Sequence, residues 1–469
     1  MHSRNLPVGM LFTLLSALAG CDGQGQSQSS GQAGSTPTGG SGGTASTSGT
    51  SPGGSSQGGS SQGGSSQGGS SSGGSSQGGS TTTSSGSTST SSASTTTSTG
   101  SGMAFCGDNT CNNGETCVTC PQDCGTCPPA LEARFNVPMG DTPDYALEDT
   151  VIDLINHAAP GSDITVSVYH FTRKLPAEAL IAAKQNKGVN VRVVLDGSNA
   201  GNQVVNLLSP VLGADLTLCQ SSGGGSCIGS NINHSKFFLF SALDNGVTNV
   251  VVQSSANLTN PMLTDHNNLV IARGDALLYQ GYLNYWLDQK ADQQNLDYYK
   301  TIDGTLPFRA YFYPRAQGDT IVSILDNVSC SAGNKKIRLA MSLFSDSRVE
   351  IAQKLVTKKQ EGCSVVTLLA DRDGSPGAAI LSTLNNGNVS TFLVTPTATR
   401  STIHSKYLLI DADYQSGANL VPRKLVFTGS HNYTGNALHD NDEQLIRVDD
   451  ADVYTAFLNN WQTIRNTVP

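Results

Sequence analysis

A repeat with a spacing of about 175 residues constrains the fold of this chain more than any other feature of its sequence. Residues 163–196 contain an apolar strand, an amphipathic helix and a second apolar strand that ends at an aspartate, and residues 336–371 follow the same pattern. Trp286 and Trp461, the only tryptophans, lie 175 residues apart and end two similar helical segments. Strands that alternate with helices form βαβ units. The pattern therefore predicts two copies of one α/β domain.

We expect the first copy to span residues 129–300 and the second 301–469. Each is predicted to be an α/β/α sandwich around a mixed, largely parallel sheet, with the copies related by a pseudo-twofold axis. Such a pair can bring the same strand-borne residues of both copies together. Neither half would hold a complete site alone, so the active site is expected at the interface.

Both copies place a histidine and a lysine two positions apart at the start of an apolar strand. The first copy has His234 and Lys236 in "NINHSKFFLF", and the second has His404 and Lys406 in "TIHSKYLLID". Side chains two residues apart on an extended chain point to the same side.

A serine and an asparagine then close the next apolar strand of each copy. They are Ser255 and Asn257 in the first copy and Ser430 and Asn432 in the second. Their spacing of two again places both side chains on one face.

Together these residues resemble the signature of the phospholipase D superfamily, H-x-K-x(4)-D followed by G-S-x-N in each half. The second half matches it throughout, with Asp411 and Gly429 at the remaining positions. The first half has Ser241 in place of the aspartate and Ser254 in place of the glycine. The resemblance covers essentially all of residues 129–469.

The resemblance also implies an orienting residue eleven positions after each asparagine, which contacts the histidine of the other half. Glu443 holds this position in the second half and Asn268 in the first. Glu443 would then serve His234, and Asn268 would serve His404. A carboxylate stabilises a cationic ring better than an amide does, which favours His234 as nucleophile and His404 as general acid.

These residue types suit the cleavage of a phosphodiester. One neutral imidazole attacks phosphorus and a protonated one supplies the leaving oxygen with a proton, while lysines and amides hold the non-bridging oxygens. We expect neither a metal nor another cofactor, because the lysines supply the positive charge. The predicted catalytic residues are His234, Lys236, Asn257, His404, Lys406, Asn432 and Glu443. The predicted supporting residues are Ser255, Asn268, Asp411 and Ser430.

The chain begins with a predicted export signal, residues 1–20. A short basic start and an apolar run lead to Leu18, Ala19, Gly20 and Cys21, which match the bacterial lipobox. The motif implies cleavage before Cys21 and acylation of its thiol; the alternative is an ordinary secretory signal with a chance cysteine. We therefore expect an exported protein anchored by lipid to a membrane of a bacterial cell envelope, with the particular membrane and exposure at the cell surface left open.

Residues 21–101 consist almost entirely of Gly, Ser, Thr and Gln, a composition that predicts a disordered tether. A flexible coil of this length reaches roughly 50 Å.

Residues 102–128 form a cysteine-rich segment too small for a hydrophobic core. In an exported protein its cysteines predict three disulfides of open connectivity, with zinc binding at two C-x-x-C pairs as the alternative. These cysteines are Cys106, Cys111, Cys117, Cys120, Cys124 and Cys127. Cys219 with Cys227, and Cys330 with Cys363, are further candidate disulfides.

The sequence predicts a metal-independent phosphodiesterase that acts on phospholipid through a phosphohistidine, with water or an alcohol as acceptor. A nuclease acting on DNA or RNA is the alternative enzyme. Residues 129–469 contain 26 Lys and Arg against 32 Asp and Glu, which disfavours a nucleic-acid partner. An inactive binding module displayed at the surface is the alternative from another class. We expect a monomer, because both half-sites lie in one chain.

Overall fold

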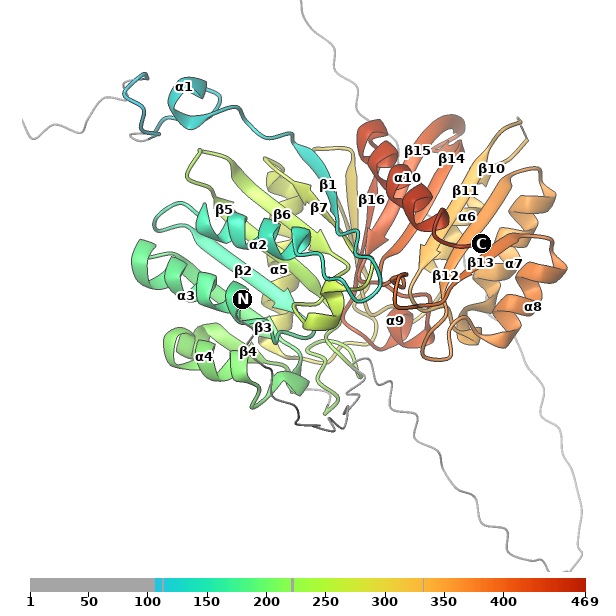
Figure 1. Cartoon of the computed structure of the whole chain (residues 1–469), viewed down its shortest axis with the longest axis horizontal. Coiled ribbons are helices and arrows are strands. Elements are labelled where there is room, and N and C mark those ends of the chain that lie inside the picture. The colour runs from blue at the N-terminus through green and yellow to red at the C-terminus, as the bar shows by residue number, and fades with distance from the viewer. Residues whose placement is uncertain (1–105, 112–113, 221–222, 332) are drawn as a thin grey trace, which may run out of the picture. The chain divides into compact units, whose positions relative to one another are not determined.

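The computed structural model describes residues 106–111, 114–220, 223–331 and 333–469 (Figure 1). The predicted signal, Cys21 and the predicted tether lie outside these residues. Among the residues described, no helix is both long and apolar enough to cross a membrane.

The first half is built on a seven-stranded sheet in the order β1-β7-β6-β5-β2-β3-β4. The strands are β1 (Leu131–Phe135), β2 (Asp163–Val168), β3 (Asn190–Leu195), β4 (Leu216–Leu218), β5 (Lys236–Ala242), β6 (Thr248–Ser254) and β7 (Asn268–Ala272). Only the β2–β3 and β3–β4 pairs are parallel.

The second half is built on a nine-stranded sheet in the order β13-β12-β11-β14-β15-β16-β9-β8, with β10 paired to β14. The strands are β8 (Lys300–Asp303), β9 (Phe308–Phe312), β10 (Val328–Ser329), β11 (Lys336–Met341), β12 (Ser364–Ala370), β13 (Ser390–Val394), β14 (Lys406–Ser416), β15 (Asn419–Gly429) and β16 (Gln444–Val448). The parallel pairs are β11–β12 and β12–β13.

The prediction of two homologous α/β domains with mixed sheets is confirmed, but the prediction that the sheets are largely parallel is wrong. The βαβ units expected from the sequence are present, as β2–α3–β3 and β11–α7–β12. After β5 and after β14, however, the chain returns directly, so β5–β6–β7 and β14–β15–β16 are antiparallel. A parallel return needs a crossover of a dozen or more residues, and the β5–β6 and β14–β15 connections are shorter.

Helices cover both faces of each sheet. The longer ones are α2 (Ala146–Asn156), α3 (Lys174–Lys187), α4 (Gln203–Leu212), α5 (Ala276–Ala291), α6 (Thr320–Asp326), α7 (Val349–Gln360), α8 (Ala378–Asn386) and α10 (Ala451–Arg465). Helices α2 to α4 pack on one face of the first sheet, and α6 to α8 pack on one face of the second. The short helices α1 (Pro121–Cys124) and α9 (Gly435–His439) lie in loops.

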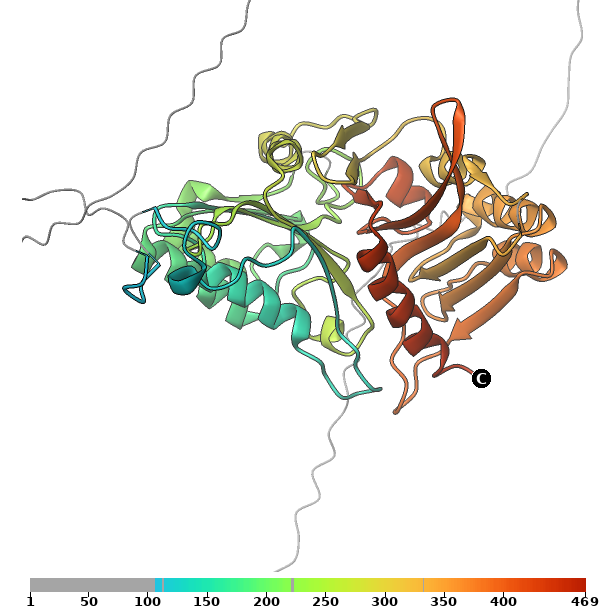
Figure 2. The same cartoon turned by 90° about the horizontal axis from the view of Figure 1, so that it is seen from above.

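Helices α5 and α10 lie between the two sheets, within one core to which both halves contribute (Figure 2). The Phe135 and Phe457 rings pack 4.8 Å apart, which joins β1 of the first sheet to α10. The repeated tryptophans anchor these helices. Trp286 Nε1–H donates to the Val166 carbonyl at 2.9 Å, and Trp461 Nε1–H donates to the Leu339 carbonyl at 3.1 Å. The repeat therefore preserves the docking of a helix on the first strand of each βαβ unit.

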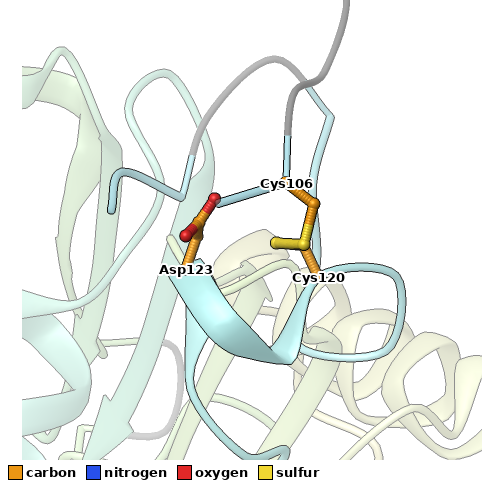
Figure 3. A group of neighbouring side chains, drawn as sticks. All are labelled: Cys106, Cys120 and Asp123. Carbon is orange, nitrogen blue, oxygen red and sulfur yellow. A yellow bond between two sulfur atoms is a disulfide. The ribbon is translucent and has the colours of Figure 1, made fainter. Parts of the chain in front are cut away.

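All ten described candidate cysteines form disulfides. The pairs are Cys106–Cys120, Cys111–Cys124, Cys117–Cys127, Cys219–Cys227 and Cys330–Cys363. Asp123 lies beside the first of them and accepts hydrogen bonds from the N–H groups of residues 107–109 (Figure 3). The cysteine-rich segment contacts the β5–β6 turn, where Cys117 N–H donates to the Asn245 carbonyl at 2.9 Å.

Candidate active site

The histidine–lysine pairs of both halves are buried where the halves meet. His234 and His404 each lie two residues before the first residue of a strand, β5 or β14, and that first residue is the motif lysine. His234 is 4% exposed and His404 is 1% exposed. Backbone pairs join the halves beside both histidines, Asn233 with Asp442 and His266 with Ile403. Each motif strand therefore begins against a segment of the other half.

His234 is oriented by Glu443 of the second half. Its Nδ1 lies 2.9 Å from Glu443 Oε1 and 3.0 Å from Oε2. Glu443 is fully buried and also accepts hydrogen bonds from the Ser430 hydroxyl and from Asn441 Nδ2–H. With Nδ1–H donated to the carboxylate, Nε2 is the ring nitrogen of His234 that carries the lone pair.

Burial raises the pKa of Glu443 to about 7, because an ionised carboxylate is costly to remove from water. The positive charge of Lys236 opposes this shift. The carboxylate that faces His234 therefore changes charge near neutral pH.

His404 is oriented by Asn267 and not, as expected, by Asn268. His404 Nδ1 lies 2.9 Å from Asn267 Oδ1, whereas Asn268 Nδ2–H donates to the Thr428 hydroxyl at 2.9 Å. The contact still crosses between the halves and still pairs this histidine with an amide. The structure therefore has the expected carboxylate partner for His234 and amide partner for His404, but the amide belongs to Asn267.

Strand register explains why counting from the asparagine missed Asn267. Ser254 pairs with Leu269 in the first sheet, and Gly429 pairs with Leu445 in the second. Position 269 thus corresponds to 445, and Asn267 corresponds to Glu443. The connection in the first half is one residue shorter. Aligning "NLVIA" with "QLIRV", the two strands that follow, identifies Asn267 directly.

The motif serines support the orienting residues. Ser255 Oγ–H donates to Asn267 Oδ1 at 3.0 Å, and Ser430 donates to Glu443. Each half therefore holds its own orienting residue and presents it to the histidine of the other half.

The lysines and asparagines complete the two sets. Lys236 Nζ donates to the His234 carbonyl at 2.9 Å, and Lys406 Nζ donates to the His404 carbonyl at 2.6 Å. Asn257 and Asn432 are buried, three residues beyond the ends of β6 and β15, and within the described structure no hydrogen-bond partner reaches the Oδ1 atom of either. A buried polar group without a partner costs about 1–3 kcal/mol. These matched amides are therefore suited to a polar ligand.

Asp411 does not join this group. It lies five residues along β14 from Lys406, which places it about 17 Å away at the rise of an extended strand. Ser241 occupies the matching region of β5, and its Oγ accepts the Asp163 N–H at 2.8 Å. Asp411 and Ser241 therefore both lie in the part of their strand that is remote from the histidines. The replacement of the motif aspartate by Ser241 in the first half does not remove a contact with a histidine.

Two further residues lie against the site without being part of the motif pairs. The Tyr169 ring lies 5.3 Å from the His234 ring and 5.4 Å from Lys236 Nζ. His431, inside the second G-S-x-N motif, is 1% exposed and stacks on Tyr313 at 4.3 Å. Burial lowers the pKa of His431 to about 3, so this ring is neutral. Neither the contacts of Tyr169 nor those of His431 can be predicted from the sequence, because they depend on how distant segments pack.

Groups of side chains that could hold a metal ion lie outside these sets. Two of the three such groups in the described residues contain sulfur atoms already joined in a disulfide, Cys106–Cys120 or Cys219–Cys227. The third comprises Asp108, Glu115 and Asp123 in the cysteine-rich segment.

A family model and several solved structures resemble parts of this chain. A family model described as "Cardiolipin synthase, PLD-like domain" matches residues 151–285 and again residues 329–464. No curated protein matches the sequence. Among solved structures, phosphatidylserine synthase from Haemophilus influenzae Rd KW20 superposes with a TM-score of 0.52 at 14% identity, over 72% of this chain and 87% of that one. The phospholipase D family member Nuc from Salmonella typhimurium has 20% identity and a TM-score of 0.27, over 34% of this chain and 95% of that one.

Proposed function

Because the chain belongs to the phospholipase D-like family and contains two copies of its domain, we propose that it is a metal-independent phosphodiesterase that cleaves phospholipids through a phosphohistidine. The observation that carries the proposal is the crossed orientation of the two buried histidines. His234 is held by a carboxylate of the second half, and His404 is held by an amide of the first.

In the first step, the lone pair of His234 Nε2 forms a bond to phosphorus, and the bond from phosphorus to the leaving oxygen breaks. Protonated His404 gives its Nε2 proton to that oxygen. Glu443 stabilises the positive charge that appears on the His234 ring, while the lysines and amides hold the non-bridging oxygens.

In the second step, neutral His404 takes a proton from water or an alcohol, whose oxygen then bonds to phosphorus. The bond between phosphorus and His234 breaks and its electrons return to the ring. Both histidines are thereby restored to their starting states.

Two features favour phospholipid over nucleic acid as substrate. Residues 129–469 are acidic overall. Apolar side chains are also exposed between β1 and α2, where Val137 is 45%, Met139 68% and Tyr145 43% exposed. This segment lies beside the start of the second motif, because Ser401 Oγ–H donates to the Gly140 carbonyl at 3.2 Å. Such a rim suits contact with a lipid surface.

The location we propose is outside the cytoplasm, with the chain anchored through acylated Cys21. The five disulfides indicate an oxidising, extracytoplasmic compartment. Lipid attachment, and a monomer as the active form, belong to the same proposal.

A substrate panel tests this proposal. The purified chain, incubated at physiological salt with vesicles of several phospholipids and with single- and double-stranded DNA, is expected to release lipid head groups faster than it cleaves DNA. Nucleic-acid binding requires Lys and Arg to neutralise phosphates, and this chain has an excess of acidic residues. Efficient DNA cleavage with no head-group release from any vesicle would instead assign the chain to the nucleases.

Turnover is expected to survive a chelator. Lys236 and Lys406 supply the positive charge that a metal ion provides in other phosphodiesterases, so excess EDTA should change the rate by less than about two-fold. The melting temperature is followed in the same samples, because Asp108, Glu115 and Asp123 form the one acidic cluster of the described residues that could tie folding to a cation. Loss of turnover at an unchanged melting temperature, restored by a divalent ion, would contradict the metal-free mechanism.

A further inference from the structure

A buried carboxylate of the second half holds a segment of the first half. Asp442, with no exposed surface, accepts hydrogen bonds from Ser226 Oγ–H at 2.6 Å and from the N–H groups of Cys227 at 2.8 Å, Ile228 at 3.1 Å and Gly229 at 2.7 Å. We name Ser226–Gly229 the clasped segment. Its Cys227 is joined to Cys219, so the segment is also tied covalently to the residue that follows β4.

The contact continues along both chains toward the predicted catalytic residues. Asp440 contributes its carbonyl, which accepts the N–H groups of Ser230 at 2.7 Å and Asn231 at 3.0 Å, and Asp442 N–H donates to the Ile232 carbonyl at 3.0 Å. The two segments pair in parallel, so His234 and Glu443 follow side by side at the same end of this ladder. The ladder therefore fixes the relative position of the two residues that make the hydrogen bond.

A series of side-chain hydrogen bonds runs alongside these backbone contacts. Asn231 Nδ2–H donates to Asn441 Oδ1 at 3.0 Å, and Asn441 Nδ2–H donates to Glu443 Oε1 at 3.1 Å. Displacement of the clasped segment would thus be transmitted to the carboxylate that faces His234.

The backbones of the clasped segment and of residues 440–443 approach closely at Gly229, where a side chain would not fit. A Cβ atom on Gly229 would lie 2.0 Å from the Asp440 carbonyl oxygen, which is backbone and cannot turn aside. Close approach of two backbones is one of the uses of glycine. The two segments are therefore held at a fixed separation.

Burial of a charge at this place is costly. Removal of a carboxylate from water is unfavourable unless hydrogen bonds replace the lost solvation, and replacing buried charges by apolar residues is often neutral or stabilising. Burial raises the pKa of Asp442 to about 6, so the group is still largely ionised at neutral pH. The four donors of the clasped segment replace that lost solvation, so the buried charge depends on the segment staying in place.

The second half-site lacks this arrangement. By the register given above, the counterpart of Asp442 is His266. Its backbone makes the matching contacts, with His266 N–H donating to the Thr402 carbonyl at 2.8 Å and His404 N–H donating to the His266 carbonyl at 2.9 Å. Its side-chain Nδ1, however, has no hydrogen-bond partner in the described part of the chain. Within the described residues, the Asp442 carboxylate and the Cys219–Cys227 disulfide thus fix only the segment that leads to His234.

We infer that Asp442 is a positioning residue for the proposed reaction: its carboxylate fixes the clasped segment against residues 440–443 and thereby holds Glu443 on Nδ1 of His234. The inference rests on the proposed function for its effect on turnover, but not for its effect on the hydrogen bond. It also supplies a structural reason for His234, rather than His404, to carry the covalent intermediate.

The test replaces Asp442 by asparagine in the full chain. Asparagine has nearly the same size but only one accepting oxygen, and its NH₂ group would face N–H donors. We expect kcat to fall about 10- to 100-fold with KM changed by less than about three-fold, the range seen when a residue behind a functional side chain is altered. Backbone amides of residues 227–229 should exchange with deuterium faster, and the Nδ1 proton resonance of His234 should shift or broaden in the NMR spectrum of protein labelled with ¹⁵N-histidine.

Two variants accompany this test. Asp413→Asn removes a carboxylate paired with Lys335 at 2.8 Å, well along β14 from His404, and is expected to change none of the readouts. Ser226→Ala removes one of the four donors and should produce a smaller change in the same direction, even if Asp442→Asn does not fold.

The readouts separate two kinds of failure. Exchange and NMR need no substrate, so they decide the positioning role even if the wild-type chain turns over no phosphodiester. An unaltered His234 resonance and unaltered exchange in Ser226→Ala and in folded Asp442→Asn would overturn the inference. The same would follow if Asp413→Asn changed these readouts equally.

Discussion

Replacement of His234 by alanine is expected to abolish the phosphohistidine and to lower turnover at least about 10³-fold, the scale of losing a nucleophile. The reason is the Glu443 carboxylate, 2.9 Å from His234 Nδ1, which stabilises the cationic ring that results from attack. Rapid quenching during turnover of a slow substrate, followed by peptide mapping, should locate the phosphoryl group on His234 in the wild-type chain and on no residue in the variant.

His404→Ala provides the matched control, because it removes the other histidine of the pair. With a leaving group that needs no proton, this variant should still form the adduct on His234 but should release it slowly. An adduct mapped to His404 would reverse the two roles. Full activity without an adduct on either ring would eliminate the covalent step.

Glu443→Gln is expected to lower kcat about 10²-fold and to change its pH dependence. In the wild-type chain burial raises the pKa of Glu443 to about 7, so the ionised fraction of this carboxylate falls as pH drops through that value, and kcat should fall with it. Glutamine does not ionise. The fall in kcat below about pH 7 that is due to protonation of residue 443 should therefore disappear. A profile of kcat from pH 5 to 9 measures this.

Glu361→Gln is a suitable control, since the Glu361 side chain is 41% exposed and pairs with Lys358 of the second half at 2.9 Å. It should leave both the rate and the profile unchanged. If Glu443→Gln retains the wild-type rate and the same acidic limb, the limb belongs to another group and Glu443 does not act on His234.

The sequence was most informative where a pattern repeats. The spacing of the tryptophans and of the His-x-Lys pairs predicted the duplicated domain, and the resemblance to the phospholipase D superfamily implied the contact of Glu443 with His234. The contact assigned to Asn268 was wrong because the connection in the first half is one residue shorter, a difference that strand pairing shows and a count from Asn257 hides. Strand direction was also mispredicted, since the apolar pattern of a buried strand is the same in parallel and antiparallel pairs.

The contact of Asp442 with the clasped segment could not be predicted from the sequence. Its carboxylate and its donors are separated by more than 200 residues, and no local pattern links them. In the sequence, Asp442 is one of two aspartates just before Glu443, with nothing to indicate that it is buried.

The exchange of orienting residues between the halves has a consequence for the origin of the duplicated chain. In a symmetric dimer of single-domain ancestors, each histidine would receive the same residue from its partner, and no mutation could make the two histidines different. Joining two gene copies into one reading frame removes that restriction. The carboxylate at Glu443 and the amide at Asn267 are therefore a specialisation open only to the fused chain, and a single-domain version of either half would have to use identical histidines for unlike tasks.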